Sequence, residues 1–217
     1  NFKYKPSTYL LSSLINIKNN KININEFSIE EIWNNKKINK KQLKKLNNFF
    51  WIFNLDLKSS SKDIQKIIDS WIELNKKYNS DSWQVNMVSK RIISWLSNSK
   101  LTYDNGYKVY RDKFSLILQK QVHHLLNQIN NIKYYKEKIS CIAAIILFSL
   151  CFSNQEKIFV ISLNILKKHM SDVLDKFGFP KSRSIKQSVF YLKYLILIRE
   201  WCKESQRNVP EFIDEYI

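Results

Sequence analysis

The chain has 217 residues and a formal net charge of +17, from 36 Lys and Arg against 19 Asp and Glu. Hydrophobic residues make up 44% of it, which excludes a disordered polymer. With only two Gly and three Pro, a Gly-rich nucleotide-binding loop and a turn-rich all-β fold are also excluded. The composition therefore predicts a basic, all-α protein that can bury a sizeable core.

The first half of the chain reads as a succession of amphipathic helices. Apolar residues recur at spacings of three and four over residues 6–17, 42–57, 63–78 and 83–101. Between the first two segments the chain is polar and Asn-rich, and Ser28 to Glu31 offers a capping box for one short helix. We expect residues 1–40 to form a lead-in and residues 41–217 to form the main helical domain.

The second half continues the pattern, with helices predicted over 110–129, 139–152, 157–176 and 185–203 and a stub after Pro210. Residues 139–152 are apolar on nearly every side but fall short of the roughly 20 residues that span a bilayer. They predict a buried central helix and no membrane span. Ser153 to Glu156 forms a second capping box, and residues 177–184 read as a loop.

Short links between helices of similar length favour antiparallel hairpins. Hairpins of this kind stack as a bundle, a solenoid or a closed α/α toroid, and periodicity alone does not choose among these. Cys141, Cys151 and Cys202 show neither a disulfide framework nor zinc spacing, and the three histidines lack ligand spacing. We therefore expect no metal and no cofactor.

The positive charge has two readings. Lysine supplies most of it, and Lys, Asn and Ile all have A/T-rich codons, so nucleotide bias accounts for part of the excess. A charge of +17 is also typical of proteins with an acidic partner, such as nucleic acid, anionic lipid or acidic polysaccharide. The few arginines are better clues, because a guanidinium makes forked contacts to carboxylates and sulfates.

Two residues between 49 and 96 are candidates for binding. Trp83 starts a helix beside Asp81 and Ser82, where its ring either stacks on a sugar or packs in the core. Arg91 either pairs with a carboxylate, Asp69 or Asp81, or binds a carboxylate or sulfate of a substrate.

The same region resembles a known family. W-I-x-x-N at residues 71–75, followed by S-W-x-x-x-x-x-S-x-R-I-I-S-W-L at residues 82–96, is similar to the N-terminal helical domain of heparinase II/III-like proteins, closest to their alphaproteobacterial branch. The likeness continues through QKQVHHLL at 119–126, a small-residue helix at 143–152 and FGFPKSRS at 177–184. It covers about residues 43 to 207.

The resemblance implies an incomplete α/α toroid that binds an acidic polysaccharide and cleaves it by β-elimination across a uronic acid. It implies a β-sandwich domain as a partner, which this chain does not contain, and a bacterial source. The implied catalytic residues are His124 and Tyr191. The implied substrate-binding residues are Trp83, Arg91, Gly178, Ser182 and Arg183.

Two alternatives stay open. The Asn-His and Tyr-His pairs of characterised relatives align near residues 136–137 and 187–188, where neither is retained. A relative that holds polysaccharide without cleaving it fits that departure. The second alternative is a helical nucleic-acid-binding protein, motivated by the charge. The sequence shows no helix-turn-helix and no Arg-rich helix face, so nucleic acid is not the partner we expect.

Overall fold

The protein is all-α over the residues that the structure, a computed structural model, describes: 2–15, 33, 39–55 and 60–217. These residues hold no β-strand, only the isolated bridges Phe2–Phe152 and Leu174–Pro180. The predicted fold class is confirmed at this level. The capping box at Ser28 to Glu31 and most of the predicted lead-in lie outside the described residues.

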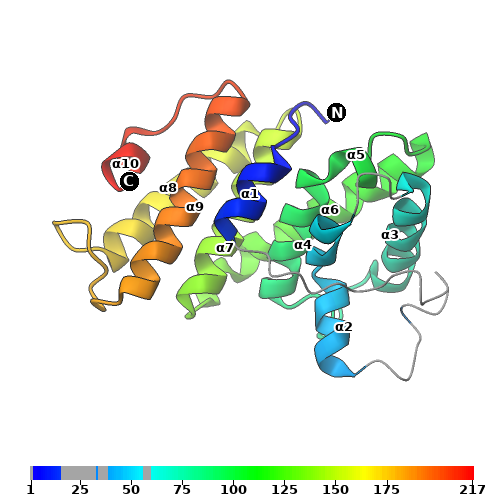
Figure 1. Cartoon of the computed structure of the whole chain (residues 1–217), viewed down its shortest axis with the longest axis horizontal. Coiled ribbons are helices and arrows are strands. Elements are labelled where there is room, and N and C mark those ends of the chain that lie inside the picture. Colours follow the sequence, from blue (N-terminus) through cyan, green and yellow to red (C-terminus); the bar gives the residue numbers. More distant parts are fainter. Residues whose placement is uncertain (1, 16–32, 34–38, 56–59) are drawn as a thin grey trace.

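Ten α-helices and two 3₁₀ turns follow one another along the described chain (Figure 1). They are α1 (Thr8–Ile15), α2 (Lys40–Asn47), η2 (Phe50–Asn54), α3 (Ser61–Asn75), α4 (Val85–Ser97), α5 (Ser99–Thr102), α6 (Lys108–Gln128), η3 (Ile129–Asn131), α7 (Tyr135–Cys151), α8 (Glu156–Val173), α9 (Ile185–Glu204) and α10 (Glu211–Glu215). Residues 152–155 link α7 to α8, residues 174–184 link α8 to α9, and α7 packs against both α8 and α9.

Helix α7 is the central helix of the fold. Every residue from Ile139 to Cys151 is buried, and the helix packs against α4, α6, α8 and α9 (Figure 1). A helix that is apolar all round needs protein on every side, so this arrangement confirms the predicted buried helix. Among the described helices, none combines the length and the apolar character needed to cross a membrane.

Two of the predicted helices are each divided into two shorter elements, and the periodic pattern of apolar residues did not predict the positions of these breaks. The segment 42–57 stops at Asn47, because Phe49 adopts a left-handed φ of 59° before η2 begins. The Phe49 ring is fully buried and meets the Trp71 and Trp95 rings edge-on. Burial of this ring in an aromatic cluster offsets a backbone strain of about 1–2 kcal/mol. The segment 83–101 is also interrupted, at Asn98 between α4 and α5, where φ is −102° and ψ is 34°, outside the left-handed region.

The helix caps follow the sequence in part. Ser184 caps α9, because its hydroxyl accepts a hydrogen bond from the Gln187 amide. At the start of α8 the N-cap position falls on Gln155, two residues after the predicted Ser153, and the Gln155 side chain makes no capping hydrogen bond.

Candidate functional site

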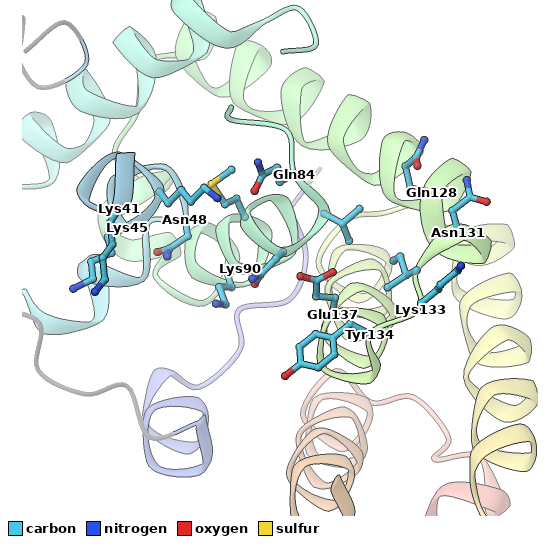
Figure 2. A pocket seen from close by; sticks show the side chains of 15 residues that line it. Lys41, Lys45, Asn48, Gln84, Lys90, Gln128, Asn131, Lys133, Tyr134 and Glu137 are labelled. Carbon is cyan, nitrogen blue, oxygen red and sulfur yellow. The ribbon is translucent and has the colours of Figure 1, made fainter. Parts of the chain in front are cut away.

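A groove of about 840 Å³ lies between α2, the start of α4 and the segment that joins α6 to α7 (Figure 2). We call it the lysine groove, after the five lysines in its wall. They are Lys41, Lys44, Lys45, Lys90 and Lys133. Glu137 is the one acidic residue in that wall, so the groove has a strong positive potential.

Lys90 lies in the middle of the lysine groove, between the α2 lysines and Glu137 (Figure 2). Burial lowers the pKa of its ammonium, and the negative charge of Glu137 offsets part of that effect. None of the five lysines forms an ion pair with another described residue. No carboxylate of the described residues therefore competes with an anionic ligand for these ammonium groups, although that of Lys90 also lies 5.8 Å from the centroid of the Phe50 ring.

Neutral polar groups complete the wall of the groove. Five amide side chains line it. They are Asn48 after α2, Gln84 and Asn86 at the start of α4, Gln128 at the end of α6 and Asn131 in η3. Tyr134 is 52% exposed at the groove's edge (Figure 2). Amides donate to and accept from hydroxyl groups, and an exposed aromatic face matches the apolar face of a sugar ring. Lysines, amides and a tyrosine together suit an acidic saccharide.

Arg91 was expected at a carboxylate or at a substrate, and the structure corrects both expectations. Its guanidinium is fully buried and donates to the carbonyl oxygens of Asn47 at 2.7 Å and Ser82 at 3.0 Å, and to Gln121 Oε1 at 3.3 Å. It lies 3.9 Å from the centroid of the Trp71 ring. Burial lowers its pKa well below the usual value. Arg91 thus joins α2, the α3–α4 connection and α6 from inside, and no ligand at the surface can reach it.

Two other predicted residues, Trp83 and His124, do meet. The His124 Nε2 atom lies 3.0 Å from the Trp83 carbonyl oxygen, and the two rings pack edge-on at 5.5 Å. This bond assigns the proton to Nε2 and leaves Nδ1 as an acceptor. Burial lowers the pKa of His124, so the imidazole is neutral at pH 7. Trp83 itself is only 5% exposed and its Nε1 donates to the Asn75 carbonyl, so its ring is a packing residue.

His124 and Trp83 line a second, open pocket of about 470 Å³, which we call the histidine pocket. Its other polar walls come from Lys76, Gln119, Lys120, His123 and Asn127. The exposed aromatic there is Tyr78, 67% exposed, with its ring centroid 5.5 Å from that of His124. The exposed aromatic ring beside His124 is therefore that of Tyr78 and not that of Trp83.

The predicted loop residues Gly178 and Arg183 lie together between α8 and α9. Both have a left-handed φ, 80° and 55°. The Arg183 guanidinium pairs with the Asp175 carboxylate at 2.6 Å, and the other oxygen of that carboxylate accepts from the amides of Phe177 and Phe179. These bonds hold the turn in shape. Arg183 is thus committed to its own loop while its side chain stays 69% exposed.

Ser182 and Tyr191 are connected through Gln187. The Ser182 hydroxyl donates to Gln187 Oε1 at 2.7 Å, and Gln187 Nε2 donates to the Tyr191 hydroxyl at 3.0 Å. Tyr191 is 2% exposed and packs against His169. Burial raises the pKa of its hydroxyl, so it is a poor base at neutral pH.

The predicted site residues therefore fall into separate places. Neither described pocket is lined by Arg91, Arg183 or Tyr191, and only the histidine pocket takes up His124. Within the part of the chain that the structure describes, no cluster of His, Cys, Asp or Glu could hold a metal ion.

Sequence reasoning missed the lysine groove, because a lysine-rich composition hides individual lysines. A local signal was present: Lys41, Lys44 and Lys45 are spaced by three and four and share one face of α2. Comparison with known proteins adds nothing to this picture, since no family model matches the chain and no curated protein or solved structure matches it significantly.

Proposed function

We propose that this chain is the helical domain of a heparinase II/III-like protein and that it binds an acidic, uronate-containing polysaccharide in the lysine groove. The observation that carries the proposal is the groove itself, with one carboxylate and five lysines that form no ion pair with a described residue. The motif block at residues 71–96 and the all-α fold support the family assignment. As part of the same proposal, the hairpins belong to an incomplete α/α toroid and work beside a β-sandwich domain.

Electrostatics and hydrogen bonding explain why such a polymer suits the groove. Each uronate residue brings one carboxylate and several hydroxyl groups, and the groove presents ammonium groups beside amides. Lys90 lies between the α2 lysines and Glu137, so it is placed to contact a carboxylate of a bound chain. The lysines outside the groove raise the encounter rate by steering a polyanion toward the surface.

Cleavage by β-elimination needs a base, an acid and a group that neutralises the carboxylate, all close together. His124 contacts Trp83 and Tyr78, whereas Tyr191 contacts Gln187, His169 and Tyr135. Their different surroundings favour a binding role for this chain without its own base and acid pair. Any lyase activity of the whole protein then depends on groups outside the described residues.

The test is binding to alginate and heparin by isothermal titration calorimetry, with two matched triple variants. Lys41→Gln, Lys45→Gln and Lys90→Gln remove three charges from the groove. The control removes three exposed charges elsewhere, at Lys62, Lys157 and Lys168. We expect the groove variant to lose about tenfold or more in affinity and the control less than about threefold.

Equal losses in both variants would show that binding follows net charge alone and would overturn the groove as the site. Tighter, strongly salt-dependent binding to DNA than to either glycan would favour the nucleic-acid alternative. Release of unsaturated uronate, followed by its ultraviolet absorbance, would overturn the purely binding role.

A further inference from the structure

We infer that a bound polysaccharide runs from the lysine groove along one face of α6 into the histidine pocket, where a second sugar stacks on Tyr78. This inference rests on the proposed function and adds a second subsite to it. It also predicts which chains bind best: those long enough to touch both places.

The two pockets adjoin each other at two points of the chain. Trp83 lines the histidine pocket, and its neighbour Gln84 lines the lysine groove. In the same way, Asn127 belongs to the histidine pocket and Gln128 to the lysine groove. The segment that leads into α4 and the end of α6 therefore border both pockets.

The spacing along α6 makes the connection continuous. Lys120, His124 and Asn127 line the histidine pocket, and Gln128 and Asn131 line the lysine groove. Successive members of this row are mostly three or four residues apart, which places them on one side of the helix. From Lys120 to Gln128 the row is about 12 Å long. A single sugar ring cannot touch both ends, whereas an oligosaccharide can.

The histidine pocket has the features of a saccharide subsite. The Tyr78 ring is 67% exposed and packs against two other rings. Its centroid lies 6.3 Å from that of Trp83 and 5.5 Å from that of His124. Among the described residues, no Asp or Glu lines the pocket. Lys76 is paired with Glu73 at 3.1 Å, but Lys120 makes no ion pair with a described residue and is available to a carboxylate. A ring to stack on and a nearby cation suit a uronate.

The experiment compares a heparin disaccharide with a heparin dodecasaccharide by calorimetry, using Tyr78→Ala and Tyr78→Phe. Removing the ring should weaken binding of the dodecasaccharide about three- to tenfold and leave binding of the disaccharide unchanged. Tyr78→Phe keeps the stacking face and should keep the affinity for the longer chain. Tyr107→Ala is the control, because this tyrosine is 83% exposed and lines neither pocket.

The outcomes separate the two proposals. If the groove lysine variant loses both oligosaccharides while Tyr78→Ala binds the dodecasaccharide like the unaltered chain, the second subsite is overturned and the groove stands. Equal losses for both lengths in Tyr78→Ala would also overturn the extended path. If the unaltered chain binds neither oligosaccharide, nor alginate, the proposed function fails and the extended path fails with it.

Discussion

The Arg91 guanidinium donates a 2.7 Å hydrogen bond to the backbone carbonyl oxygen of Asn47, the last residue of α2. The Asn47 side chain accepts a second bond of 2.7 Å from Trp71 Nε1 on α3. One residue of α2 is thus tied to both α3 and α4 inside the core. Because α2 carries three lysines of the groove and α4 carries Lys90, this buried connection sets the two walls of the groove against each other.

Replacing Arg91 with lysine should destabilise the fold by about 2–4 kcal/mol. A lysine ammonium cannot reproduce the fork that reaches Asn47, Ser82 and Gln121 together, and each buried carbonyl left unpaired costs about 1–3 kcal/mol. Urea unfolding measures the effect. Arg111→Lys, at a partly exposed arginine, is the control and should change stability by less than about 0.5 kcal/mol. Equal stability of Arg91→Lys and the unaltered chain would contradict the structural role.

As the pH rises, the affinity for a polyanion should begin to fall at a lower pH than the usual lysine pKa would predict. Burial lowers the pKa of Lys90, so its ammonium is lost below the usual lysine range near 10.4 while the exposed lysines stay charged. Lys90→Arg keeps the charge and should move the loss of affinity to higher pH. Titrations with alginate from neutral to alkaline pH test this, and identical profiles for the two proteins would contradict it.

His169 should make the fold less stable in mild acid. Burial, with a smaller contribution from Lys138, lowers its pKa from 6.5 to about 4, and Asp172 only partly opposes this. The unfolded chain then binds a proton that the folded chain excludes, so stability falls as the pH drops from about 6.5 to about 4. The full loss is about 3 kcal/mol.

His169→Phe keeps an aromatic ring against Tyr191 and removes the titrating group. Chemical unfolding at a series of pH values should show a shallower decline for this variant between pH 6.5 and 4. The control is His123→Phe, at an exposed histidine, which should keep the slope of the unaltered chain. An unchanged slope in His169→Phe would assign the acid sensitivity to other groups.

Gly178→Ala should cost about 1 kcal/mol of stability. Gly178 has a φ of 80°, a left-handed conformation that a Cβ disfavours, although no atom lies within 4 Å of where that Cβ would be. Gly178→Asn should lose less, because asparagine tolerates this region better. Thermal unfolding compares the two, and a larger loss for asparagine would show that space rather than backbone conformation limits the site.

Helix periodicity predicted most of the elements. The stripe of apolar residues in 63–78 became α3, and the mainly apolar segment 139–152 became the core of the central helix α7. These two helices could be predicted because residues that recur every three or four positions share one face of a helix, regardless of which elements pack against it. The break at Phe49 could not be read, since it depends on burying that ring against Trp71 and Trp95, which are distant in sequence.

The site residues were harder to predict for the same reason. Trp83 and His124 do come together, but Arg91 lies in the core and Arg183 is held by its own loop. An arginine at a helical position looks alike in sequence whether its guanidinium ends in solvent or against backbone carbonyls. Whether the guanidinium is exposed or buried depends on the residues that the tertiary fold places around it.

The sequence by itself determined that this protein is helical, basic and built around one mainly apolar helix, because these properties follow from composition and short-range spacing. Tertiary structure decided which of the many lysines share a groove and which tyrosine stays exposed beside His124. Those relationships join α2, α4 and α6 across long stretches of chain, and no local pattern encodes how separate helices meet in space.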